Sequence, residues 1–485
     1  MSILSVSFLA FLVLLTAIYH IVPGKFKPYI LLTGSIFFYL SFDIRYSLFL
    51  LFTVISTYAC GILTEKAETK EKKKLYLIIT LLINIAILIV VKYLPYTVSL
   101  IGSAFGKDFS TFKLLVPIGI SFYTLQTAGY CIDVYRGDIK AEKNFFKYSS
   151  FATFFPLILQ GPISRYSQLA DQLFSKKKPK DLYRLITFGS QLMLWGFFKK
   201  LVIADRAAIL VNTVFDNHTE YTALPILAAA LLYTVQIYTD FSGCVDICRG
   251  ASELFGINII DNFRQPYFAT SIPDFWRRWH ISLSSWLRDY VYIPLGGNRK
   301  GKTRKYINIF IVFLVSGFWH GVGLQYIAWG MLHGAYQIAG GITMPMRKKL
   351  CSSMHINRES VPYKLFQQLF TFALIVESWI FFRSDSVTTA LRMTKRLIFN
   401  WDSTPLSSLL NLGLDVNDFI ILAVSLVLLF TVSVLRAKKI PVREKTAKAP
   451  LPIRWIIYLA VFMAVLVFGI YGPGYSDASF IYMNF

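Results

Sequence analysis

Long apolar runs alternate with short basic loops along this chain. Leu75–Val91 carries no charged residue, and Phe419–Leu435 and Trp455–Tyr471 have the same character. Each run approaches the ~20 residues that a helix needs to cross a bilayer. A segment in lipid must satisfy its own backbone hydrogen bonds, and the ~10-residue alternation of a β-barrel is not seen, so these runs predict transmembrane helices.

The pattern predicts an all-α polytopic membrane protein with 11 or 12 crossings. Twelve would fall near 2–22, 28–44, 46–63, 75–94, 114–134, 185–203, 222–242, 306–319, 322–342, 365–383, 417–435 and 452–471. Two further stretches are expected to be re-entrant or interfacial, since 143–165 is interrupted by Pro156 and Pro162 and 261–299 is dense in Arg, Trp and Pro. Residues 384–413 predict an amphipathic helix on the outer surface.

Composition and charge agree with a membrane protein. Of 485 residues, 55% are hydrophobic and 16% are charged, against about 25% charged in soluble domains. The net charge of +23 gathers in short loops: Lys66–Lys74, Arg136–Lys143, Lys176–Lys180, Arg299–Lys305, Arg347–Lys349 and Arg436–Lys448. Because basic loops stay in the cytoplasm, both termini are expected outside it. Basic loops of this kind interact with anionic lipid. The chain has no separate basic domain of the kind that would predict nucleic-acid binding.

We interpret residues 1–485 as one membrane domain. It would comprise N-terminal helices in 1–135, a catalytic core with re-entrant segments in 136–345, and C-terminal helices with an extracytoplasmic tail in 346–485. No zinc signature, phosphate-binding glycine loop or Gly-x-Ser-x-Gly elbow occurs in the sequence, so neither a metal nor a covalent serine mechanism is expected.

The segment from Ser271 to Asn298 is one candidate for chemistry. Ser271 followed by Asp274 is a helix-capping signature. A continuous helix starting there would align Trp276 and His280 on one apolar stripe with two leucines. The histidine is then either a buried structural residue or a group that handles protons or orients substrate.

Two further stretches carry ionisable groups at membrane depth. His320 lies between two apolar segments, before a glycine, and His333 farther along favours a structural role. Asp240 and Asp246 lie within or at the edge of a span, so they must be paired, neutral or facing water. We expect them to pair with arginines of the 277–288 segment.

Five motifs together resemble the membrane-bound O-acyltransferase family. They are FWRRWHISLSSWLRDYVYIPLGGN, SGFWHG, QIYTDFSG, ILQGPISRY and ESWIFFR, which fall in the family's order. The resemblance implies that His320 is the family's invariant histidine and His280 its second, variable position. YIPLGGN at 292–298 resembles the polysaccharide, alginate-type O-acetyltransferase branch, whereas the teichoic-acid D-alanyl-transfer branch usually lacks that continuation.

The resemblance implies a bacterial cytoplasmic-membrane enzyme that takes an acyl group from a cytoplasmic thioester such as acetyl-CoA, with no bound cofactor. His320 would act as general base, and His280 would polarise the carbonyl or orient the partner group. A dry tunnel would be lined by six residues: Trp276, Trp279, Trp319, Asp240, Ser282 and Asn298. The alternatives to an enzyme are a transporter or flippase and a scaffold for secretion. Paired broken helices, which are typical of transporters, are not visible in the sequence.

The chain ends GYSDASFIYMNF, with an apolar cluster after the last predicted span. Family systems that acetylate polysaccharide usually work with a separate extracytoplasmic SGNH-hydrolase-like transferase. The tail resembles the Phe-Ile-Tyr ending of such systems, which implies that Tyr482 docks the partner, lines the exit or carries the acyl group. Alternatively, the tail only rests on the membrane surface.

Overall fold

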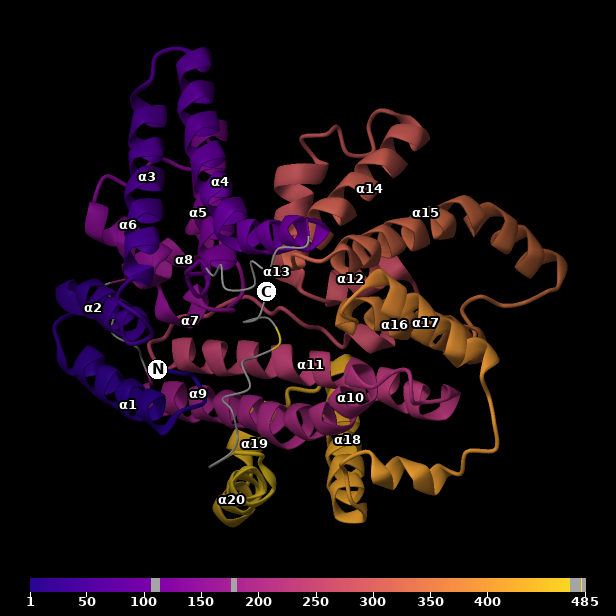
Figure 1. The fold of residues 1–485 in the computed structure, drawn as a ribbon. Helices are drawn as coiled ribbons and strands as arrows, with labels where there is room; N and C mark the ends of the chain where they lie inside the picture. Colours follow the sequence, from indigo (N-terminus) through magenta and orange to yellow (C-terminus); the bar gives the residue numbers. More distant parts are fainter. Residues whose placement is uncertain (106–113, 176–180, 472–480, 482–485) are drawn as a thin grey trace. The chain divides into compact units, whose positions relative to one another are not determined.

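The computed structural model describes residues 1–105, 114–175, 181–471 and 481, and every regular element in these ranges is a helix (Figure 1). The all-α prediction is therefore confirmed. Six helices are long and apolar enough to cross a membrane: α3 (Tyr46–Lys66), α4 (Lys70–Ala104), α11 (Ala223–Glu253), α16 (Val361–Arg383), α18 (Val416–Ala437) and α20 (Leu451–Phe468). The chain is a multi-pass membrane protein.

The other six predicted crossings also coincide with helices, which are shorter or more polar than those six. They are α1 (Val6–Ile21), α2 (Lys27–Leu40), α5 (Ile120–Arg136), α9 (Leu182–Phe197), α14 (Gly301–His320) and α15 (Leu324–Ser353). At α9 the chain continues directly into a π-helical turn, η2 (Phe198–Ala204), and then into α10 (Asp205–Asp216). Apolar periodicity thus located the helices, although it placed some of their ends several residues away.

The chain divides into two compact units. Residues 1–193 and 244–260 belong to the first, and residues 194–243 and 261–481 to the second, so α9 and α11 each contribute to both. In the first unit, 143–165 forms two short helices, α6 (Phe145–Ala152) and α7 (Phe155–Ile158), and not a spanning helix. Residues 148–164 of this stretch are all buried, as expected for irregular backbone that protein must surround.

In the second unit, α14 and α15 form a helical hairpin (Figure 1). A Cβ at Gly330 would lie 2.3 Å from the carbonyl oxygen of Phe313, and one at Gly317 would lie 2.4 Å from that of Tyr326. Only glycine permits so close an approach of two helices. This tight packing fixes the position of His320, which is the last residue of α14.

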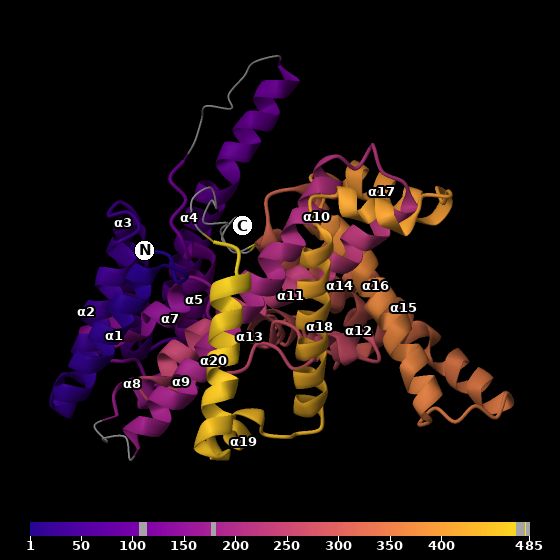
Figure 2. The ribbon, with the colours of Figure 1, turned by 90° about the horizontal axis from the view of Figure 1, so that it is seen from below.

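The hairpin packs against α16 and against the short helix α12 (Ile272–Arg278), which is followed by α13 (Ile281–Leu287). Figure 2 shows the chain passing from α18 through α19 (Val442–Lys448) into α20. The expected amphipathic helix over 384–413 is shorter than predicted: α17 ends at Phe399 after starting at Val387. Arg206 of α10 links the start of α18 to the end of α20, because its guanidinium contacts Asp418 at 3.0 Å and the carbonyl oxygen of Phe468 at 2.9 Å.

Candidate active site

His280 lies at a break between two short helices. The predicted cap is present, since the Ser271 hydroxyl accepts a hydrogen bond from the Asp274 amide. The predicted continuous helix is wrong: α12 ends at Arg278, and His280 has a left-handed backbone with φ of 44°. Asn262 holds the break, because its carbonyl oxygen accepts from the Ile281 amide and its side-chain oxygen accepts from the next amide. A tertiary contact, and not helical periodicity, therefore aims the imidazole.

The two histidines converge as expected. Their ring centroids are 6.4 Å apart, and both side chains are at most 1% exposed. The ring of His280 meets Phe241 edge-on at 4.8 Å, and its Nδ1 lies 3.4 Å from the side-chain amide of Asn262. Burial lowers the pKa of His280 to about 3, so this imidazole is neutral at pH 7. It can donate or accept a hydrogen bond without adding a charge.

Aromatic rings enclose the histidine pair. His320 contacts Trp319, Trp329 and Phe382 at centroid distances of 4.9, 5.0 and 5.5 Å. The predicted tunnel tryptophans differ in exposure: Trp279 is 1% exposed within the aromatic core, whereas Trp319 is half-buried. Such a shell excludes water from the imidazoles, which suits a reaction that must not end in hydrolysis.

Asp240 is part of a buried ion cluster. Its Oδ1 lies 2.6 Å from Lys200 Nζ, which also lies 2.9 Å from Asp205. The lysine belongs to the π-helical turn η2, and Gly243 lets α11 approach that turn, since a Cβ there would lie 3.3 Å from the Lys200 amide nitrogen. The three charged side chains are between 2% and 6% exposed. Mutual pairing makes their burial tolerable.

The expected pairing of the aspartates with arginines of the 277–288 segment is therefore wrong. Arg277 and Arg278 instead contact Asp274 on their own helix, at 3.4 and 3.1 Å. Asp246 pairs with Arg249, one turn away, at 3.7 Å. The arginines follow helical spacing, which places residues three and four apart on one face.

The remaining predicted site residues are dispersed. Ser282 is buried directly after the histidine break, whereas Asn298 is exposed and does not line the cavity described below. Tyr482 lies outside the described residues. Its neighbour Ile481 donates a backbone hydrogen bond of 2.9 Å to Asp240 Oδ2.

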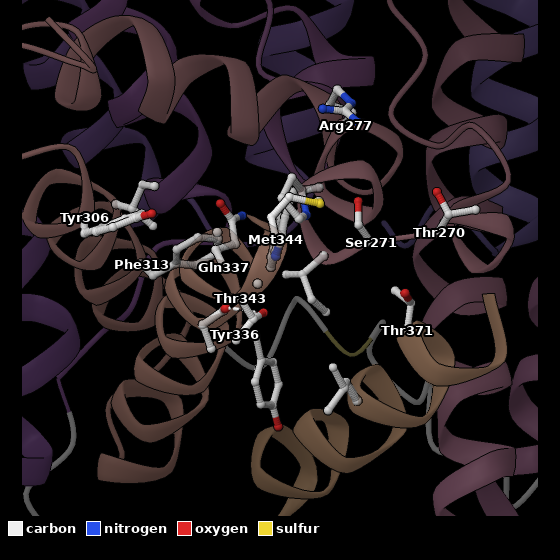
Figure 3. Close-up of a pocket in the computed structure, with 18 of the residues that line it drawn as sticks. Thr270, Ser271, Arg277, Tyr306, Phe313, Tyr336, Gln337, Thr343, Met344 and Thr371 are labelled. Atoms are coloured by element: carbon white, nitrogen blue, oxygen red, sulfur yellow. Dashed lines mark hydrogen bonds between the residues drawn. The ribbon is translucent and has the colours of Figure 1, made fainter. Parts of the chain in front are cut away.

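A cavity of about 990 Å³ opens in the second unit, and Figure 3 shows side chains that line it. Residues of α12, α14, α15 and α16 line it; the labelled ones include Arg277, Phe313, Tyr336 and Thr371. Four basic side chains lie along it: Arg277, Arg288, Lys305 and Arg347. The described lining contains no carboxylate. Most of its other lining is apolar or aromatic. The cavity fits an anionic molecule with an apolar part.

The cavity reaches the vicinity of His320. Ser316 lines it and precedes His320 by one turn of α14, and its buried hydroxyl has no hydrogen-bond partner within the described chain. Trp276 also lines it, and the indole N–H of Trp276 donates to His333 Nδ1 at 3.2 Å. A molecule seated in the cavity would therefore approach the histidine layer, meaning the buried pair of His280 and His320.

Sequence reasoning missed five contributors: Trp329, Trp379, Lys200, Asn262 and Ser316. Trp379 stands within ESWIFFR, and Ser316 begins SGFWHG, so motif position carried a signal for these two. Asn262 and Lys200 act across long sequence separations, and periodicity contains no information about such pairs.

Comparisons with known proteins show the family to which the chain is similar. Residues 139–380 match the membrane-bound O-acyltransferase family. A probable alginate O-acetylase from Pseudomonas syringae is 34% identical over 418 residues, covering 85% of this chain and 78% of that protein. A peptidoglycan O-acetyltransferase from Helicobacter pylori is 33% identical over 76% of this chain and 73% of its own length. A teichoic acid D-alanyltransferase from Bacillus subtilis is 30% identical over 46% of this chain and 58% of its own.

Proposed function

Because the chain belongs to the membrane-bound O-acyltransferase family, we propose that this O-acyltransferase moves an acetyl group from a cytoplasmic thioester across the membrane to an extracytoplasmic polysaccharide or partner transferase. The observation that carries the proposal is the buried pair of His280 and His320 beside a basic, apolar-lined cavity. The enzyme would reside in a bacterial cytoplasmic membrane with both termini extracytoplasmic, which agrees with its basic loops.

The cavity supports an acyl-CoA donor. The phosphates of coenzyme A would lie near Arg288, Lys305 and the other basic side chains, while the acyl end would enter the apolar part toward Ser316. Electrostatic attraction between phosphates and guanidinium or ammonium groups would orient the thioester. The chain would then need no bound cofactor of its own, since the donor is consumed as a substrate.

His320 is assigned the role of general base. It would take the proton of the acceptor hydroxyl as that oxygen attacks the thioester carbonyl, and return it to the thiolate when the C–S bond breaks. Such a base contributes about 10²–10⁴-fold to the rate. His280, neutral and 6.4 Å from His320, would orient the carbonyl or the hydroxyl by hydrogen bonding.

The acceptor is assigned from the relatives. The proteins similar over most of this chain are named for alginate or peptidoglycan O-acetylation, so a polysaccharide acceptor is proposed. An extracytoplasmic SGNH-hydrolase-like transferase would complete the transfer, with Tyr482 docking that partner or carrying the acyl group. The contact between Ile481 and Asp240 supports a tail that reaches the ion cluster of the second unit.

D-alanyl transfer to teichoic acid is the second candidate function. The similarity to the Bacillus subtilis D-alanyltransferase favours it, but covers 46% of the chain, against 85% for the alginate-type relative. The YIPLGGN sequence also supports the acetyl branch. A donor competition with acetyl and D-alanyl thioesters separates the two.

The test uses inside-out membrane vesicles that contain the full chain, its partner and radiolabelled acetyl-CoA. We expect His320→Ala to lower incorporation of label into polymer by about 10²-fold or more while membrane insertion stays intact. His218→Ala, at a histidine outside the site, is the matched control. Normal incorporation by well-inserted His320→Ala would overturn the mechanism, and would favour a transporter or scaffold.

A further inference from the structure

Three buried nitrogen atoms in the aromatic cluster that contacts His320 carry hydrogens that meet no acceptor in the described part of the chain. Two are the indole Nε1 atoms of Trp329 and Trp379, whose side chains are 1% and 0% exposed. The third is Nε2 of His333, which is 0% exposed. Because the Trp276 indole donates to His333 Nδ1, that atom is the acceptor and the neutral imidazole keeps its hydrogen on Nε2.

The three rings form one contact network that includes the general base. Trp329 lies 5.0 Å from both His320 and His333, measured between ring centroids. It stacks on Trp379 at 5.9 Å with the ring planes 14° apart. All three donors come from the paired helices α15 and α16, so their positions are fixed by packing and not by a loop.

The network lies directly behind the wall of the cavity. Trp276 lines the cavity and contacts Trp329 and His333 at 5.7 and 5.0 Å, whereas the three donor residues do not line it. An acyl group that passes from the cavity toward His320 would therefore enter the neighbourhood of these N–H groups.

Physical chemistry gives a reason to expect a ligand there. A buried donor without an acceptor costs free energy, and buried tryptophan N–H groups usually find a partner. Trp329 contacts His320, and the other two donor residues contact Trp329. Three such donors in one cluster suit an oxygen that gains negative charge, because preorganised donors in a dry site stabilise developing charge strongly. The N–H of Trp276 in the same network already donates to His333. Within one cluster of the described chain, therefore, one indole N–H has an acceptor and two do not.

We propose that the N–H groups of Trp329, Trp379 and His333 bind the carbonyl oxygen of the acyl group and the oxyanion that forms on it. The inference rests on the proposed acyl transfer. The acceptor oxygen bonds to the carbonyl carbon, its proton passes to His320, and the carbonyl π electrons move onto the oxygen held by the donors. Collapse restores the carbonyl and breaks the C–S bond, and the departing thiolate takes the proton from His320.

The test measures steady-state acetyl transfer by the full chain in nanodiscs with its partner and acceptor. Trp329→Phe and Trp379→Phe remove one N–H each, and a second pair of proteins carries 3-benzothienylalanine at the same positions. That residue keeps the shape of indole and replaces N–H by sulfur, so it isolates the donor from packing. Trp195→Phe, on α9 and stacked on Phe198, is the matched control.

We expect kcat to fall by about 10²-fold for each lost donor, while KM for acetyl-CoA stays within about threefold. If a Phe variant does not fold, the 3-benzothienylalanine protein decides. Unchanged kcat in the benzothienyl proteins, or a rise in KM alone, would overturn the oxyanion assignment and leave the proposed function standing. A wild-type protein that turns over no acyl-CoA would overturn both.

Discussion

The ion cluster around Lys200 allows a sharp test of the packing in the second unit. Lys200→Met removes a cation that contacts both Asp240 and Asp205, at 2.6 and 2.9 Å. At an effective dielectric constant of about 20, each contact is worth about 6 kcal/mol before the cost of desolvation. Because desolvation offsets much of that energy, we expect a net loss of about 3–5 kcal/mol in the free energy of unfolding.

The order of the variants' free energies of unfolding tests the same idea without depending on their absolute values. Asp240→Asn leaves Lys200 with Asp205 and keeps an amide oxygen for the Ile481 N–H, so it should cost only about 1.5–3 kcal/mol. The double variant Lys200→Met, Asp240→Asn should be more stable than Lys200→Met alone, because one of the two carboxylates that share the lysine is then neutral.

The assay is reversible unfolding by sodium dodecyl sulfate in mixed micelles, followed by tryptophan fluorescence. Lys348→Met, at an exposed lysine of α15, is the control and should stay within about 0.5 kcal/mol of wild type. If Lys200→Met is no more destabilising than Asp240→Asn, the shared lysine does not balance the two carboxylates, and the account of this cluster fails.

Three further outcomes are expected. Burial holds the pKa of His280 at about 3, below its usual 6.5. The stability that the neutral imidazole contributes is therefore present above pH 6.5 and is lost as pH falls toward 3, by up to about 1.4 kcal/mol per pH unit. His280→Asn should be less acid-sensitive in the same unfolding assay. Arg288→Glu and Lys305→Glu should each raise KM for acetyl-CoA about tenfold, and by less at high salt, whereas Lys348→Glu should not. If all three variants have the KM of the wild type, acetyl-CoA does not bind in this cavity. Deleting 480–485 should preserve hydrolysis or binding of the donor thioester and block transfer to polymer. Tyr482→Phe should keep transfer if the tail only docks, and normal transfer after the deletion would mean that the tail is only a membrane-surface anchor.

The amino-acid sequence by itself determined the membrane class, the helix positions and the two histidines. Apolar runs must become helices in lipid because no other open structure satisfies the backbone, so each of the twelve predicted crossings met a helix. His320 was identified because an ionisable group beside glycine at membrane depth is costly unless it has a use. These inferences depend only on local composition and spacing.

Tertiary structure alone decided how those residues work together. Periodicity predicted a straight helix through His280, but Asn262, 18 residues earlier, holds a left-handed break there. Asp240 met Lys200 across two helices and not an arginine nearby in the predicted segment, since pairing in a buried cluster depends on which helices pack together. Trp329 and Trp379 joined the histidine layer for the same reason: helix packing brings together side chains that have no fixed spacing along the chain.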